Sequence, residues 1–344
     1  MKHSDDLHIR VEGRAGCITL QRPKALNALS HAMCLEIEDA ITAWAADDGV
    51  DHIVIDAEGD RAFCAGGDIQ EMYDTGTAGD FAYGRRFWQD EYRLNAKLKL
   101  YPKPIVTLLQ GFTMGGGVGL GCHASHRIVG ESSQIAMPEV SIGLVPDVGG
   151  SLMLAHAPGN TGDYLATTAA RMGPGDAIYA GFADHYVPEA DWLALKAALT
   201  ETLEIPEHAA PPAPLADLQD ELKHHFYGNT PGDILRSLEG SESDFSAATA
   251  KKLRRHSPLA MACGLETLRR LRSTQDITRA LELEYRFTFR AMEHGDFIEG
   301  IRAQIIDKDR QPKWRHDIAA LPAADVSRML RPLGPDTLNL EDPE

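Results

Sequence analysis

Basic residues are scarce in this sequence. The 344 residues include 34 lysines and arginines against 51 aspartates and glutamates, a formal net charge of −17 at pH 7. This acidic balance argues against nucleic acid and anionic membrane surfaces as partners, because both are negatively charged. It leaves anionic small molecules open as ligands, since local lysines and backbone N–H groups can hold a phosphate on an acidic protein.

Cysteines are also few, and they carry no spacing that suggests a disulfide framework or a zinc site. The five are scattered, odd in number and free of Cys-x-x-Cys pairs: Cys17, Cys34, Cys64, Cys122 and Cys263. We therefore predict reduced thiols in a cytoplasmic protein. The fourteen histidines show no His-Glu-x-x-His or similar ligand spacing. We expect no bound metal.

Several segment types and catalytic motifs are missing. No apolar run approaches the length of a membrane-spanning helix, and residues 1–6 have no apolar signal core, so we expect neither a membrane partner nor a secretory signal. No Gly-Lys-Ser/Thr follows a glycine loop, which excludes a Walker site. The absence of a dinucleotide-binding glycine pattern and of a Gly-x-Ser-x-Gly elbow disfavours Rossmann enzymes and serine hydrolases.

The pattern of the remaining residues predicts an α/β core followed by a helical region. Strand and helix signals alternate over residues 1–203, which suggests repeated ββα units. Residues 204–216 are rich in proline and alanine and are interpreted as a linker or insertion. Residues 217–344 are helical in pattern, and we expect them to pack on the core.

The first elements follow from local signals. Residues 7–12 and 17–21 alternate polar and apolar around a glycine-containing turn, which predicts a hairpin. Ser30 is a suitable N-cap for a helix with a stripe of Met33, Ile37, Ile41 and Trp44. Residues 52–57 form an apolar strand pattern.

A second helix pattern over residues 81–100 carries an acid in its apolar stripe. Glu91 falls on the same face as Phe87 and Leu94. Burial of a carboxylate without a partner is costly, so Glu91 is either a paired structural residue or an acid that faces a pocket.

Two glycine-rich turns that follow strand patterns are the strongest chemical signal. Residues 62–69 end in Gly66-Gly67-Asp68, where Asp68 could simply cap a helix. Residues 104–109 predict a buried strand that leads to the triplet Gly115-Gly116-Gly117. If a helix begins at Gly117, the N–H groups at the triplet are unpaired and can bind an oxyanion.

Two acids follow in Pro/Gly-rich turns. Glu139 lies in Met-Pro-Glu, and Asp147 lies in Pro-Asp-Val-Gly-Gly. Amide donors that face paired acids form a layout for acyl or enolate chemistry.

Residues 62–69, 111–119 and 137–150 together resemble the crotonase, or enoyl-CoA hydratase/isomerase, superfamily, over residues 7 to about 187. The resemblance implies a crotonase-like superhelix of repeated ββα units with a C-terminal helical region. More narrowly, the chain resembles the 3-hydroxyisobutyryl-CoA hydrolase family, which extends the likeness over nearly its whole length. This likeness rests on residues 90–92, 113–120, 137–150, 299–303, 306–309 and 312–314.

The resemblance also implies how an acyl-CoA is held. The amides of Gly67 and Gly116 would bind the thioester oxygen. The CoA moiety would contact two segments, which comprise Lys24, Ala25 and Leu26 in the first and Ala65, Gly67, Asp68 and Ile69 in the second. CoA is then part of the substrate, and no other cofactor is implied.

The acids distinguish between branches of the superfamily. Hydratases that this chain resembles place one glutamate just after the glycine triplet, where Gly119 stands here, and a second at the position of Glu139. Asp147 instead supplies the second acid. By resemblance, Glu139 and Asp147 are catalytic and contact substrate, together with Gly116, and Glu91 contacts the acyl group.

The predicted function is therefore hydrolysis of a short-chain 3-hydroxyacyl-CoA, with 3-hydroxyisobutyryl-CoA of valine degradation as the favoured substrate. One alternative is an enoyl-CoA hydratase or isomerase, which the glycine at position 119 disfavours. Another is a non-catalytic acyl-CoA-binding protein, which would not need the two acids. Helices at the C-terminus of such proteins often mediate oligomers, so a homo-oligomer stays open.

Overall fold

The computed structural model describes residues 5–341. By its internal contacts the chain divides into two compact units, each built from several segments. Unit 1 consists of residues 1–68, 90–136 and 171–214, and unit 2 consists of residues 69–89, 137–170 and 215–344. The boundaries expected at residues 203 and 217 stay a prediction.

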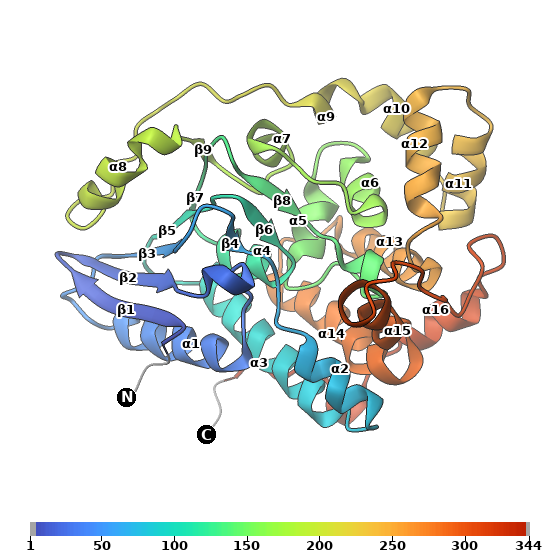
Figure 1. The fold of residues 1–344 in the computed structure, drawn as a ribbon, viewed down its shortest axis with the longest axis horizontal. Coiled ribbons are helices and arrows are strands. Elements are labelled where there is room, and N and C mark those ends of the chain that lie inside the picture. The colour runs from blue at the N-terminus through green and yellow to red at the C-terminus, as the bar shows by residue number, and fades with distance from the viewer. Residues whose placement is uncertain (1–4, 342–344) are drawn as a thin grey trace. The chain divides into compact units, whose positions relative to one another are not determined.

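All strands of the described chain belong to unit 1 (Figure 1). They are β1 (Leu7–Glu12), β2 (Ala15–Leu20), β3 (His52–Ala57), β4 (Ala62–Cys64), β5 (Ile105–Leu108), β6 (Phe112–Met114), β7 (His126–Val129), β8 (Gln134–Ala136) and β9 (His185–Tyr186). A six-stranded sheet has the order β1-β2-β3-β5-β7-β9, and a three-stranded sheet has the order β4-β6-β8.

The pairing within these sheets is mostly parallel. Only β1 and β2 pair antiparallel, which confirms the predicted hairpin, and every other pairing is parallel. Parallel strands are covered on both faces, which explains why β2, β3 and β5 are apolar along almost their whole length. From β3 onward, successive strands alternate between the two sheets.

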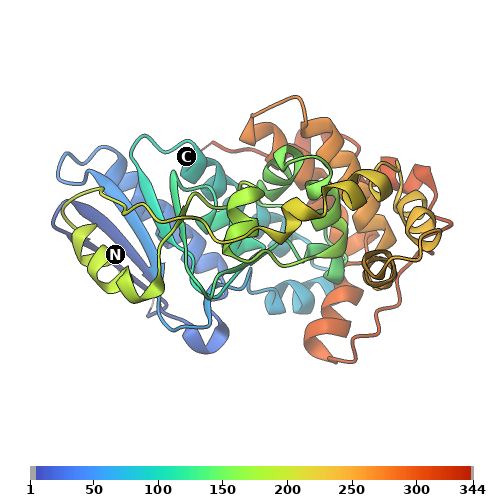
Figure 2. The ribbon, with the colours of Figure 1, turned by 90° about the horizontal axis from the view of Figure 1, so that it is seen from above.

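The helices of unit 1 pack against strands of both sheets. They are α1 (His31–Ala45), the second half of α3 (Ala82–Lys99), α4 (Gly116–Gly121), α7 (Pro174–Tyr179) and α8 (Trp192–Ala198). Figure 2 shows α8, in yellow-green, against the six-stranded sheet. There Trp192 and Leu195 pack with Val54, Val106 and Ile128 in one buried cluster. The Ser30 hydroxyl accepts a hydrogen bond from the Met33 N–H (3.2 Å), so the predicted cap of α1 is confirmed.

Within the described chain, unit 2 is made of helices and connecting turns. Its helices are α2 (Gln70–Thr77), the first half of α3, α5 (Gly150–His156), α6 (Thr161–Thr168), α9 (Pro214–Asp217, from its second residue), α10 (Gln219–His225), α11 (Pro231–Glu239), α12 (Asp244–Leu253), α13 (Pro258–Leu271), α14 (Ile277–His294), α15 (Phe297–Ile301) and α16 (Ala323–Met329). The long helices α13 and α14 have strongly apolar inner faces, in agreement with the helical pattern predicted for residues 217–344.

Shorter helical turns complete the element list: η1 (Pro23–Ala25), η2 (Glu139–Ile142), η3 (Glu189–Asp191), η4 (Arg302–Ile306) and η5 (Gly334–Asp336). Residues 202–213 contain no helix or strand, in line with their proline-rich composition. Among residues 5–341, no helix combines the length and the apolar character that crossing a bilayer requires.

Candidate active site

Two backbone amides converge in unit 1. Gly116 opens α4, and a Cβ added there would lie 3.2 Å from the Gly67 nitrogen and 2.6 Å from Glu91 Oε1. Within residues 5–341, neither the Gly67 nor the Gly116 N–H donates a backbone hydrogen bond. The first N–H groups of a helix have no partner inside the helix, so an external oxygen acceptor can take this role.

The glycine triplet is required by close backbone approach. A Cβ at Gly117 would collide with the Cys64 carbonyl oxygen at the end of β4. Gly115 has a φ of +51°, a region that disfavours other residues. The helix begins at Gly116, one residue before the predicted Gly117, which leaves the Gly116 N–H at its first turn.

Glu91 enters this corner from α3. Its side chain is buried, with 3% relative exposure, on the face that also buries Phe87 and Leu94. Both interpretations of Glu91 from the sequence put its side chain on the apolar face of the helix, and the structure confirms this position. Its carboxylate lies beside the position where a side chain on Gly116 would point.

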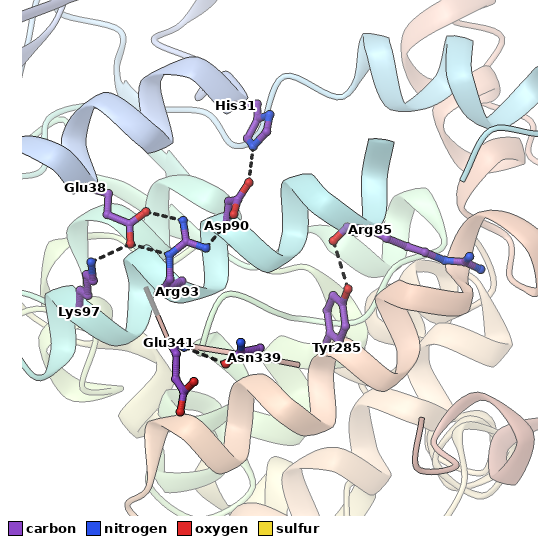
Figure 3. Close-up of polar contacts among 9 residues, drawn as sticks. All are labelled: His31, Glu38, Arg85, Asp90, Arg93, Lys97, Tyr285, Asn339 and Glu341. Atoms are coloured by element: carbon purple, nitrogen blue, oxygen red, sulfur yellow. Dashed lines mark hydrogen bonds and ion pairs between the residues drawn. The ribbon is translucent and has the colours of Figure 1, made fainter. Parts of the chain in front are cut away.

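A charged network fixes the α3 segment on either side of Glu91 (Figure 3). Arg93 donates hydrogen bonds to both oxygens of Glu38 on α1 (2.7 and 2.6 Å) and to Asp90 (2.7 Å). His31 contacts Asp90 (2.6 Å), and Lys97 pairs with Glu38 (3.0 Å). Because Arg93 and Glu38 are buried, their multiple bonds orient α3 against α1 with little freedom.

The protonation of this network follows from the same contacts. The hydrogen bonds that Arg93 donates to Glu38 raise the pKa of Arg93 above its usual range. For Asp90, burial acts to raise the pKa, but the bonds from His31 and Arg93 outweigh it and lower the pKa. Arg93 and Asp90 are therefore ionised at neutral pH.

Of the two segments predicted to contact CoA, residues 24–26 and 65–68 lie together in unit 1, and Ile69 belongs to unit 2. The Ala65 N–H donates to the Leu26 carbonyl (3.0 Å), and Leu29 bridges the strand end by bonds to Gly66 and Asp68 (2.9 and 2.8 Å). Lys24 and Ala25 form η1, and Leu26 has a φ of +52°. These bonds fix the shape of the loop with main-chain groups.

Asp68 does not cap a helix, so that alternative from the sequence is wrong. Ile69 is the N-cap residue of α2 and supplies no side-chain bond. The Asp68 carboxylate instead accepts a hydrogen bond from Arg22 (3.0 Å). A guanidinium from the neighbouring loop outcompetes the local N–H groups.

Glu139 lies in unit 2 at the first position of η2, directly after Pro138, and has 5% relative exposure. The Leu144 N–H donates to the Glu139 carbonyl (3.0 Å), and the Ser257 N–H donates to the Val140 carbonyl (3.0 Å). These bonds fix both ends of the acidic turn.

Glycines of unit 2 allow η2 to be packed this tightly. A Cβ at Gly300 on α15 would collide with the Ile142 carbonyl, and one at Gly143 would lie 2.5 Å from the carbonyl carbon of Asp296. Gly143 also has a φ of +76°. The Asp296 carboxylate accepts the Ser257 hydroxyl (2.6 Å), which joins the starts of α13 and α15.

Asp147 lies in the turn before α5 and has 3% relative exposure. Val148 and Gly149, which follow it, have φ values of +52° and +77°. A positive φ in a β-branched residue is a sparsely populated conformation that costs about 1–3 kcal/mol and persists only where the surroundings enforce it. The Gly150 N–H donates back to the Asp147 carbonyl (2.7 Å).

Reasoning from the sequence missed a carboxylate beside this turn. Glu284 on α14 is fully buried and accepts hydrogen bonds from the Gly149 N–H (2.9 Å) and from Ser151. The signal was available, because Glu284 falls in the apolar stripe of Ile277 and Leu281, as Glu91 does in its own helix. Its partners lie 133–135 residues away, which no local pattern reveals.

Other chemistry is not indicated by the described residues. All five cysteines are buried and free, which confirms the predicted reduced thiols, and burial raises the pKa of Cys64 to about 12. Among residues 5–341, no group of three or more His, Cys, Asp or Glu side chains is placed to hold a metal ion.

The fold and these sites define a class of protein. The sequence profile of the enoyl-CoA hydratase/isomerase family matches residues 15–330, and the chain belongs to this family. The predicted crotonase-like α/β fold and the resemblance are thereby confirmed.

Particular relatives narrow the class. A curated protein of Gallus gallus named 3-hydroxyisobutyryl-CoA hydrolase, mitochondrial, is 37% identical over 98% of this chain and 93% of its own length. A human protein with the same name is 35% identical over 98% and 92%. These relatives confirm the prediction of an enzyme, and they support an acyl-CoA thioester hydrolase as its type.

Solved structures of similar proteins carry other names. A structure named as an enoyl-CoA hydratase from Rhodobacter sphaeroides is 58% identical, with a TM-score of 0.95, over 97% of this chain and all of that one. One named as a carnitinyl-CoA dehydratase from Mycobacterium thermoresistibile is 38% identical, with a TM-score of 0.91, over 99% and 100%. The names therefore agree on the family and on CoA but differ in the reaction.

Proposed function

We propose that the chain hydrolyses the thioester of a short-chain 3-hydroxyacyl-CoA, with 3-hydroxyisobutyryl-CoA of valine degradation as the favoured substrate. The observation that carries the proposal is the convergence of the Gly67 and Gly116 amides beside the buried Glu91 carboxylate. Amides in this arrangement bind an oxygen that gains negative charge in the transition state.

In the proposed reaction, the thioester oxygen accepts hydrogen bonds from the amides of Gly67 and Gly116. Glu91 accepts a hydrogen bond from the 3-hydroxyl of the acyl group, since its carboxylate lies beside Gly116. A site that hydrogen-bonds a hydroxyl of the substrate discriminates strongly against substrates that lack it. One additional methyl is discriminated by only about 1–3 kcal/mol, so 3-hydroxypropionyl-CoA is the expected competitor.

Glu139 acts on the carbonyl carbon by one of two routes. It attacks the carbon directly, expels CoA as the thiolate and forms a mixed anhydride that water then hydrolyses. Alternatively, it takes a proton from water, and the hydroxide attacks the same carbon. On either route Asp147 holds the water or protonates the departing thiolate. Hydroxylamine added during turnover distinguishes the routes, because only the anhydride converts Glu139 to a hydroxamate that mass spectrometry detects.

A hydratase is the second candidate, favoured by the name of the Rhodobacter sphaeroides structure. Hydration of a double bond uses two glutamates in the hydratases that this chain resembles, and Gly119 occupies the place of the first. The chain therefore lacks the first of the two glutamates that hydration uses, and hydrolysis is the better supported reaction.

One assay separates the two. Free thiol and enoyl absorbance are recorded together over a panel of 3-hydroxyacyl, enoyl and saturated CoA thioesters of the same chain length. We expect thiol release from the 3-hydroxyacyl members and no change in enoyl absorbance. Loss of enoyl absorbance without thiol release would reject hydrolysis.

We also propose a cytoplasmic location, no cofactor apart from the CoA of the substrate, and no nucleic-acid or membrane partner. The curated relatives carry the word mitochondrial in their names, so cell fractionation is the test of location. Turnover that is unchanged after treatment with a chelator supports the proposed lack of a cofactor. Light scattering at assay concentration decides whether a homo-oligomer forms.

A further inference from the structure

Glu284 projects from the middle of α14 onto the turn that carries Asp147, all within unit 2. Its Oε2 accepts the Gly149 N–H (2.9 Å), and its Oε1 accepts the Ser151 N–H (3.3 Å) and the Ser151 hydroxyl. Both carboxylate oxygens therefore accept hydrogen bonds from residues that follow Asp147 in the chain. Because Glu284 is fully buried, it does not contribute to solubility, and its hydrogen bonds indicate another role.

The turn that carries Asp147 requires contacts from other segments to keep its conformation. Val148 and Gly149 both have positive φ values, and the conformation of the valine is one that the chain avoids on its own. A Cβ at Gly150 would lie 2.5 Å from the Met137 methyl, so the turn also packs tightly on the segment before Glu139. Glu284 receives the N–H groups that this unusual backbone directs away from the turn.

Burial and the charge of Asp147 both raise the pKa of Glu284. Helix α14 packs against α5, α13, α15 and α16. The charge of Asp147, just before α5, acts on Glu284. Burial raises the pKa of Glu284 to about 8; the Ser151 bond opposes this, and the charge of Asp147 adds to it.

We propose that Glu284 is a positioning residue for Asp147: it fixes the Asp147 turn through its hydrogen bonds with Gly149 and Ser151. The catalytic consequence rests on the proposed hydrolase function, in which Asp147 holds the water or protonates the departing thiolate. The fixing of the turn does not depend on that function.

The first test measures the turn without catalysis. Amide hydrogen exchange is recorded for a peptide that covers residues 147–151 in the wild type, Glu284→Ala and Glu284→Gln. Glu293→Gln is the matched control, because Glu293 lies on the same helix and is exposed. We expect faster exchange in Glu284→Ala and wild-type exchange in the control. Unchanged exchange in Glu284→Ala overturns the proposal, whether or not the protein is a hydrolase.

The second test measures turnover of the substrate that the wild type accepts. Displacement of a reacting group by about 1 Å can cost about 10²-fold, so we expect kcat of Glu284→Ala to fall by about that factor with KM changed much less. Glu284→Gln keeps one acceptor oxygen, so it should recover part of kcat. The pH–kcat profile of each variant is recorded as well.

The outcomes separate the two proposals. If both variants match Glu293→Gln in kcat and in pH profile and differ only in melting temperature, Glu284 is merely structural and the inference fails. If the wild type releases no thiol from any panel member, the proposed function fails, while the exchange data still decide whether Glu284 fixes the turn. Should Glu284→Ala not fold, Glu284→Gln carries both measurements.

Discussion

The candidate site residues of unit 1 and those of unit 2 differ in the kind of chemical group that they contribute. In unit 1 the donors are main-chain amides, and the defining feature is the absence of side chains at Gly67 and Gly116. In unit 2 the working groups are side-chain acids, Glu139 and Asp147, carried on tight turns. Backbone sites depend on close packing, whereas the acids depend on what surrounds each carboxyl group.

The buried structural carboxylates show the same contrast. Glu38 in unit 1 is matched by Arg93 and Lys97 and is held as an ion pair. Glu284 in unit 2 is held by N–H and O–H donors, with Asp147 as its charged neighbour. A buried carboxylate that is paired with a cation mainly contributes rigidity. A buried carboxylate that has no cation and lies near a second acid also has a raised pKa, as Glu284 does.

The largest expected effect is on turnover in Glu139→Gln. Neutralising this residue removes the nucleophile or general base, and loss of a general base typically costs about 10²–10⁴-fold. We expect thiol release to be abolished at the detection limit with an unchanged circular dichroism spectrum. Substantial residual thiol release by a folded variant would remove Glu139 from its central role.

A stability loss of similar size is expected for Arg93→Met in unit 1. The substitution leaves Glu38 and Asp90 without their guanidinium, and breaking a buried ion pair costs about 3–5 kcal/mol. Urea denaturation measures this as a lower free energy of unfolding. The control is Arg14→Met, whose ion pair with Asp51 is about half exposed, and its unfolding midpoint should stay near that of the wild type. Equal losses in the two variants would contradict the distinction between them.

Gly116→Ala tests the backbone donors with a single methyl group. The added Cβ would displace the Glu91 carboxylate and obstruct the Gly67 amide, so we expect kcat to fall by about 10²–10³, as for loss of one oxyanion donor. The matched control is Gly173→Ala, since Gly173 has a φ of −71° and nothing within 4 Å of an added Cβ. Full activity in Gly116→Ala would show that substrate is held elsewhere.

A further effect concerns the pH dependence of stability. The folded pKa of Glu284, about 8, lies above the ordinary value of 4.5, so between these values the folded state keeps a proton that the unfolded chain has lost. The contribution of Glu284 to the free energy of unfolding must therefore fall as pH rises through this window. Glu284→Gln removes this contribution, so the difference between wild type and variant should change with pH between about 4.5 and 8. A constant difference would contradict a proton-binding Glu284.

Much of unit 1 could be predicted because its signals are local. The hairpin, the Ser30 cap and the glycine turns each follow from a few adjacent residues. The partners of buried charges could not be predicted, since Arg93 and Glu38 are 55 residues apart and their pairing depends on how α3 packs on α1. Asp68 shows the same limit, because a distant arginine displaced its expected capping role.

In unit 2 the acids were found by resemblance, and the structure supplied their surroundings. No local pattern in residues 146–150 indicates that Val148 adopts a positive φ, because that conformation is imposed by packing. Glu284 was visible as an acid in an apolar stripe, yet its function depends on the turn it contacts. Sequence therefore located the acids, and the fold showed which of them act on one another.

The most direct test of the account is a crystal structure of the protein with a 3-hydroxyacyl-CoA analogue in which a methylene group replaces the thioester sulfur. The account predicts that the carbonyl oxygen lies about 2.7–3.1 Å from both the Gly67 and the Gly116 nitrogens, with the 3-hydroxyl on Glu91. A bound analogue whose carbonyl oxygen touches neither amide would contradict it.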